Sequence, residues 1–234
     1  AVIQNSQNSL SYLQVQDASL QTVGKILDRV AELRAMAQDV TKNTGDIENY
    51  SKEFVELQRQ LQQIKNETFN GISLFSAGQG GAVANDPNLN LDQANADVNE
   101  TYQAINSGNG RQFDKYGRTL YTHPGGQMND GNISLNVVNL EYVLEVGALD
   151  NRYDSTWDTG NDGTVANAIN LGNLQGTTDN IDGTTVTAAN AAARGLTADG
   201  FVSSILGVSM GQLTNAIEKL ADVRAENGAE QNRI

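Results

Sequence analysis

Three stretches of this 234-residue chain place apolar residues at alternating steps of three and four. That spacing is typical of a helix with one apolar face, and such a helix is stable in water only when that face is covered. Two of the stretches lie near the start of the chain and one lies near its end. Their apolar positions are Leu20, Val23, Leu27, Val30, Leu33, Ala37 and Val40, then Phe54, Leu57, Leu61 and Ile64, and finally Leu206, Met210, Leu213, Ile217 and Leu220.

Local signals set the expected ends of these helices. The first is predicted over residues 1–44, a rod of about 65 Å at 1.5 Å per residue, with Gly45 as its left-handed C-cap. Asp46 or Ser51 is predicted to begin the second helix. Ser209 and Gln212 fit a capping box that begins the third helix, after a turn at Gly207.

The two ends of the chain are therefore expected to share one core, since each leaves an apolar face uncovered. The predicted fold class is α+β: a long antiparallel helical rod built from both chain ends, with an inserted mixed α+β domain. We place the rod at residues 1–78 and 199–234 and the insertion at 79–198. The predicted rod core consists of Leu20, Val23, Leu27, Val30, Phe54, Leu57, Leu61, Ile64, Leu213, Ile217 and Leu220.

The middle of the chain has a different composition, rich in Gly, Asn, Asp and Thr. Residues 133–149, with sequence ISLNVVNLEYVLEVGAL, and residues 118–123 around Tyr121 are predicted to contain strands. Residues 91–108 and 187–195 are predicted to form short helices. Asn-Gly and Asp-Gly pairs are interpreted as turns between them. This composition predicts a small module distinct from the rod.

Three short motifs resemble those of bacterial flagellins. They are LDRVAEL at residues 27–33, FNGISLF at residues 69–75 and VRAENGAEQNRI at residues 223–234. In the second motif the exit of a helix is expected to be followed by an Asn70-Gly71 turn and then by one short strand, because glycine accepts positive φ. The resemblance covers residues 1–78 and about 205–234, and it stops at the insertion.

The resemblance implies a secreted structural subunit of the flagellar filament. The rod would contact other flagellin subunits, the insertion would face outward, and an export chaperone and the filament cap protein would be further partners. Flagellins carry additional terminal segments that pair as coiled coils. Because this chain starts and stops within predicted helices, we interpret it as a trimmed flagellin and do not expect it to polymerise alone.

The first motif also implies an innate immune receptor of the host as a partner. In many flagellins the similar stretch is bound by the Toll-like receptor for flagellin, and the matching positions are Arg29 and Leu33. The chain departs from the family at two neighbours, Asp28 and Ala31. Both changes make the surface more negative, which opposes the usual charge complementarity of that interaction.

Charge and composition argue against several classes of partner and binding site. The formal net charge is -13, which disfavours nucleic acid and anionic membranes as partners. No cysteine is present, so neither a disulfide nor a thiolate metal site is available. No stretch reaches the roughly 18 apolar residues of a membrane-spanning helix.

The sequence offers little for catalysis or cofactor binding. His123 is the single histidine, and no common catalytic motif occurs, so we expect neither an enzyme nor a cofactor. Asp158 and Asp162 suggest a calcium loop, but Gly160 and Ile169 occupy positions where ligands are needed, and we favour an ordinary turn. Tyr153 and Trp157 fit either sugar stacking or, more often, a local core.

Two alternatives to a filament subunit follow from the same residues. The first is the hook–filament junction protein, which shares the rod helices. The second is a flagellin-like protein of the cell surface whose insertion binds an exported ligand such as a polysaccharide. Of the three, we favour the filament subunit, because the three motifs occur together.

Overall fold

The computed structural model of this chain describes residues 2–69, 71–75, 80–84, 101–103, 109–114, 116–121, 134–146, 169–173, 187–192 and 195–233. The described part is mostly helical. Its long helices come from the two ends of the chain, and the inserted residues lie between them in sequence.

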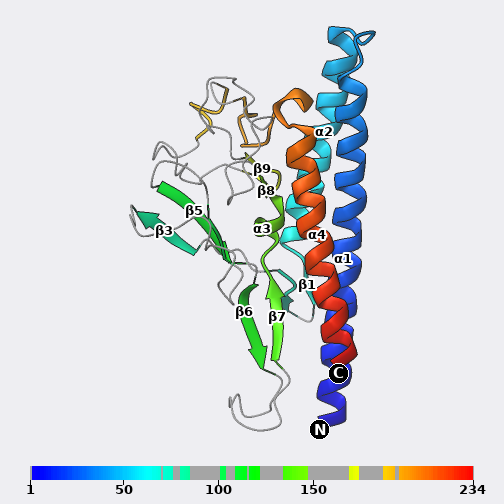
Figure 1. Cartoon of the computed structure of the whole chain (residues 1–234), viewed down its shortest axis with the longest axis vertical. Coiled ribbons are helices and arrows are strands. Elements are labelled where there is room, and N and C mark those ends of the chain that lie inside the picture. Colours follow the sequence, from blue (N-terminus) through cyan, green and yellow to red (C-terminus); the bar gives the residue numbers. More distant parts are fainter. Residues whose placement is uncertain are drawn as a thin grey trace.

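Three long helices form a rod (Figure 1). They are α1 (Val2–Ala37), α2 (Thr44–Lys65) and α4 (Met210–Arg233). α1 runs antiparallel to both α2 and α4, so the N- and C-terminal ends lie at the same end of the rod. α1 packs against α4, the helix from the opposite end of the chain. The predicted pairing of the two chain ends is thus present.

The first helix ends earlier than predicted, at Ala37 rather than near Thr44. Val40, assigned to the apolar stripe, is 98% exposed. Asp39 accepts hydrogen bonds from both the backbone N–H and the hydroxyl of Thr41, which offers the backbone an alternative to helix. The chain then turns, and the 1–44 prediction was wrong over its last turns.

The start of the second helix also differs from the prediction. Asn43 is its N-cap, and Asn43 and Asp46 form a reciprocal capping box. Gly45 lies inside the first turn of α2 instead of ending α1. Asp46 is the third residue of the helix and Ser51 lies well inside it.

The start of α4 follows the prediction more closely. The Ser209 hydroxyl accepts from the backbone N–H of Gln212, and the Gln212 side chain accepts from the backbone N–H of Ser209, so the capping box is confirmed. A short 3₁₀ turn, η4 (Ile205–Gly207), precedes it. Leu206 lies in that turn and is 46% exposed, so its assignment to the apolar stripe was wrong.

The strands are short and pair two or three at a time. β1 (Thr68–Phe69) and β2 (Ile72–Ser73) form a hairpin with Gly71 at φ 77°; the turn and the strand after it were predicted, and the strand before it was not. β5 (Asn109–Asp114) lies between β3 (Gly80–Ala84) and β4 (Thr101–Gln103). β6 (Tyr116–Tyr121) pairs with β7 (Ser134–Val138), and β8 (Glu145–Val146) pairs with β9 (Ile169–Asn170), all antiparallel.

Three predictions within the insertion need correction. Residues 101–103, predicted as helix, form β4, and residues 188–191, also predicted as helix, form turns. The apolar stretch from residue 133 is not strand throughout, because α3 (Leu140–Leu144) interrupts it. Short apolar runs fit a buried helix turn as well as a strand, so periodicity alone does not separate them.

The core lies where the three stripes meet and extends past the predicted domain boundary. Of the predicted core residues, Leu57 and Ile217 are only partly buried and pack against its edge. The others are buried: Leu20, Val23, Leu27, Val30, Phe54, Leu61, Ile64, Leu213 and Leu220. The same cluster includes Leu140, Tyr142 and Leu144 of α3, so the inner part of the insertion packs on the rod.

Candidate functional site

The described residues contain two polar clusters where the chain leaves the rod and where it returns. The exit lies after the β1–β2 hairpin. There the Tyr12 hydroxyl donates to the carbonyl oxygens of Ser73 and Leu74, and Gln16 Nε2 donates to Leu74 O at 2.7 Å. Side chains of α1 thus bind backbone groups at the end of the hairpin.

The same cluster reaches α4 through a buried amide. Asn227 Nδ2 donates to Gln16 Oε1 at 2.8 Å and to Leu13 O at 3.3 Å. Asn227 and Gln16 are both buried, so each satisfies a group that water does not reach. The exit cluster therefore links the hairpin, α1 and α4 at one level of the rod.

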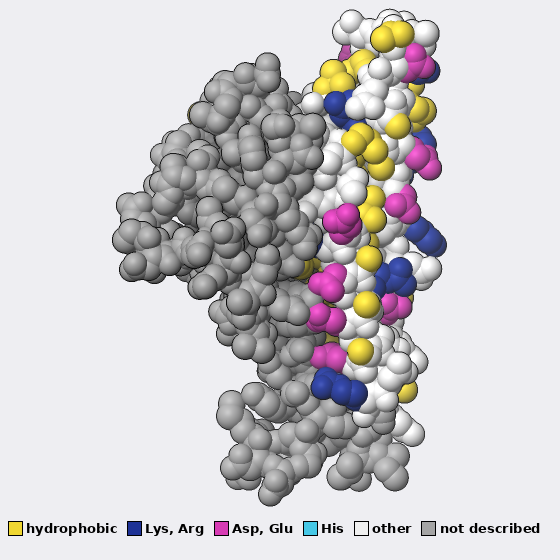
Figure 2. Space-filling view, viewed as in Figure 1, with side chains coloured by type: hydrophobic (Ala, Val, Ile, Leu, Met, Phe, Trp, Pro, Cys, Tyr) yellow, Lys and Arg dark blue, Asp and Glu magenta, His cyan; other side chains and the backbone are white. Residues whose placement is uncertain are grey.

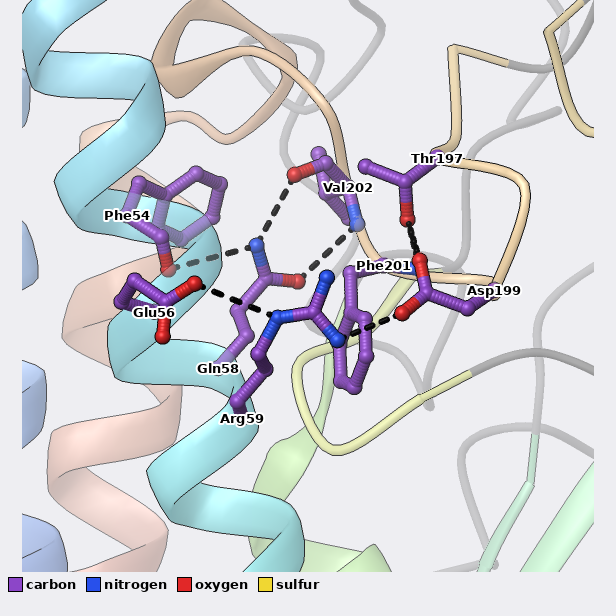
Figure 3. A network of polar contacts seen from close by, with 8 residues as sticks. All are labelled: Phe54, Glu56, Gln58, Arg59, Thr197, Asp199, Phe201 and Val202. Carbon is purple, nitrogen blue, oxygen red and sulfur yellow. Dashed lines mark hydrogen bonds and ion pairs between the residues drawn. The ribbon is translucent and has the colours of Figure 1, made fainter.

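The return point is the segment before α4, residues 196–208, which we call the strap. Gln58 of α2 binds both sides of one strap residue: Nε2 donates to Val202 O at 2.9 Å, and Oε1 accepts from Val202 N–H at 3.0 Å (Figure 3). Ser51 Oγ accepts from Ile205 N–H at 3.1 Å. From α1, Arg34 Nε donates to Val208 O at 2.7 Å.

Charged groups border the strap on its exposed side. Arg59 forms an ion pair with Asp199, and its guanidinium lies 4.9 Å from the ring centroid of Phe201 (Figure 3). The Thr197 hydroxyl donates to Asp199 at 2.6 Å. The bond from Thr197, followed by the bond from Arg59, lowers the pKa of the Asp199 carboxyl.

The two positions implied for receptor contact have different surroundings. Arg29 lies on the surface between α1 and α2, bound to Glu53 at 2.7 Å and to Glu32 at 2.9 Å. The hydrogen bond that Arg29 donates to Glu53, followed by the one that it donates to Glu32, raises the pKa of the Arg29 guanidinium. Leu33 is fully buried in the core. A partner on this surface would therefore meet Arg29 and its carboxylates but not the Leu33 side chain.

The visible face of the rod carries a mixed charge pattern. Figure 2 shows a run of hydrophobic side chains along the rod, with acidic and basic side chains on either side of it. The ion pairs on the surface of the rod include Lys52–Glu48 within α2 and Arg224–Asp17 between α4 and α1. Such exposed pairs add little stability, so the pattern matters for association more than for folding.

Several residues singled out from the sequence lie outside the described residues. They are His123, Tyr153, Trp157, Asp158, Gly160 and Asp162. Within the described residues, no group of three or more His, Cys, Asp or Glu side chains is placed to hold a metal ion. In the same part of the chain, none of the helices combines the length and apolar character needed to cross a membrane.

Sequence reasoning missed the polar residues of the two clusters, although a signal was present. Gln58 lies four positions after Phe54 and three before Leu61, on the apolar stripe itself. Gln16 follows Leu13 by three positions, and Asn227 follows Val223 by four. An amide on an otherwise apolar stripe indicates a buried hydrogen-bond partner.

Comparison with known proteins adds no relative. The sequence matches no model of a protein family, and no curated protein is significantly similar to it.

Proposed function

We propose that the chain is a flagellin-like structural subunit, secreted and assembled into a filament at the bacterial surface. The observation that carries the proposal is the rod itself. The N-terminal hairpin and the C-terminal helix pack together, with both chain ends at one end of the rod and a long insertion between them (Figure 1). This is the arrangement that the three flagellin-like motifs imply.

The second motif adds a local observation. Its strands β1 and β2 form a tight hairpin, and the residues that follow, Leu74 and Phe75, are buried in the rod core. Gly71 has positive φ, and no atom lies within 4 Å of a Cβ built on it, so glycine is required there by the backbone and not by crowding. Since no family model matches, support comes from these motifs and the architecture together.

In this proposal residues 79–198 form the mixed α+β module that faces away from the filament axis. The rod supplies the contacts between subunits in an open, heterologous lattice. The partners are other copies of the subunit, with an export chaperone and a cap protein during assembly. No catalytic step and no cofactor are involved.

Immunogold labelling tests this role in the source organism. Antibodies raised against the 234-residue chain are expected to label flagellar filaments along their whole length. A single labelled band at the base of each filament would instead identify the hook–filament junction protein. Label confined to the cell envelope would overturn the filament role and favour a surface-binding protein.

A further inference from the structure

The strap binds the rod helices through buried apolar side chains and through its backbone. Its apolar side chains Val202, Ile205 and Val208 are buried, while the polar groups of its backbone bond to side chains of α1 and α2. Ser203 and Leu206, which lie between these positions, are exposed. The apolar side chains therefore anchor the strap in the core, and the bonds to its backbone fix its course along the helices.

The residues that form these bonds are spaced nearly equally along α2 and along the strap. Gln58 and Ser51 lie two turns apart along α2. Their partners, Val202 and Ile205, are separated by extended backbone, with Ser204 in the β region. Two helical turns and three residues of extended chain cover nearly equal lengths. The strap thus runs antiparallel to α2, with its bonding positions in step with the helix.

Gln58 makes it energetically unfavourable for the strap to bind in a shifted position. Its side chain is fully buried, and it bonds to the N–H and the C=O of the same residue. If the strap shifted by one residue, Gln58 would face a residue whose polar groups point the other way, because successive residues of extended chain alternate in direction. Buried donors and acceptors would then lack partners, at a cost larger than the gain from each bond.

The strap leads directly into α4. Val208, held by Arg34, is followed by Ser209, the N-cap of that helix. The position of the strap therefore fixes where α4 begins and which of its faces meets α1. α4 itself carries several buried polar residues, including Gln212, Asn215 and Lys219, so its apolar pattern specifies that position less sharply.

We propose that the strap is a clasp that holds α4 on the α1–α2 hairpin, with Gln58 as the positioning residue that keeps the clasp closed. The strap and α4 detach from the α1–α2 hairpin and bind to it as one unit. That unit binds to the surface of α2 between Ser51 and Gln58. The half-exposed Arg59–Asp199 pair supports the outer edge of the clasp but does not determine its position. This device is independent of any role in a filament.

Hydrogen exchange of the whole 234-residue chain tests the proposal with Gln58→Met, which keeps the length of the side chain and removes both bonds. The amide protons of Val202 and Ile205 are expected to exchange about tenfold faster or more. The exchange rates of the amides from Leu213 to Leu220 in α4 are expected to rise by a similar factor, and those in α1 are expected to change less. Gln60→Met, at an exposed position of the same helix, is the matched control and should leave these rates unchanged.

Ser51→Ala provides a milder variant in case Gln58→Met does not fold. It removes the acceptor for Ile205 N–H. Hydrogen exchange in the strap and at the start of α4 should therefore again become faster together, by a smaller factor. Faster exchange in the strap with unchanged rates in α4 would overturn the proposal, because α4 would then dock independently. Unchanged exchange at Val202 in Gln58→Met would overturn it as well.

Discussion

At the scale of single residues, two kinds of buried side chain hold the rod together. Apolar residues such as Phe54 and Leu61 fill the space between the helices. Polar residues such as Gln16 and Gln58 bind backbone groups at the points where the chain leaves and re-enters the rod. The first kind supplies most of the stability, and the second selects one arrangement among several that bury similar area.

Leu61→Ala tests the shared core. Leu61 is fully buried within the cluster to which α1, α2 and α4 all contribute, so its truncation leaves a cavity. We expect the free energy of unfolding to fall by about 2 to 5 kcal/mol. Chemical denaturation measures it, with Gln60→Ala as the exposed control on the same helix. An effect no larger than that of the control would show that the stripes do not share one core.

The ion pair at the edge of the strap predicts a pH dependence. The pKa of Asp199 is lowered from its ordinary value of 3.8, so the carboxylate stabilises the folded state above that value and loses this effect as the pH falls through the lower, folded-state pKa. Asp199→Asn should therefore lower the melting temperature at pH 6 and have progressively less effect below pH 3.8. A difference that stays constant down to pH 2 would contradict this account.

At the scale of elements, helix ends depend on local side chains as much as on the apolar stripe. The stripe of the first helix continues to Val40 in the sequence, yet the helix ends at Ala37. Asp39 and the Asn43–Asp46 capping box favour a turn over continued helix. The antiparallel hairpin of α1 and α2 follows from this turn.

Asn43→Ala tests the capping box. Asn43 accepts from the backbone N–H of Asp46 at 2.9 Å, a donor that would otherwise lack a partner in the first turn of α2. We expect a loss of about 0.5 to 2 kcal/mol, measured by thermal or urea unfolding. Asn49→Ala, at an exposed position inside the same helix, serves as the control. Equal effects of the two substitutions would show that the cap does not matter.

The elements also show what the sequence could and could not predict. Steps of three and four placed α1, α2 and α4 and most of their core residues, because helical periodicity is a local property, but they missed Tyr12, Leu13, Ile26, Ala216 and Val223. The partner of Gln58 lies 144 residues away, at Val202, and no local pattern shows that contact. Residues 101–103 were predicted as helix within the segment 91–108, yet they form a strand that pairs with residues 112–114.

At the scale of the whole molecule, the rod separates the chain ends from the insertion. Both ends lie at one end of the rod, and the chain leaves and returns through segments whose backbone is bound to rod side chains. The inner part of the insertion, α3, packs on α4 through Tyr142, whose ring lies 5.2 Å from the Lys219 ammonium. A mechanical force on the insertion would therefore be transmitted to the rod at three places: the exit after the β1–β2 hairpin, α3 and the strap.

The net charge of -13 predicts how copies of this chain interact. At about 0.01 M salt the Debye length is about 30 Å, so like charges on two rods repel each other before they touch, whereas at about 1 M it is about 3 Å. The visible rod surface carries a run of hydrophobic side chains flanked by charges of both signs, so attraction at short range acts once the repulsion is screened (Figure 2). We expect a monomer in sedimentation velocity at low salt, with self-association appearing only as salt increases. Association that is strongest at low salt would show that complementary charges, and not screened repulsion, govern contacts between copies.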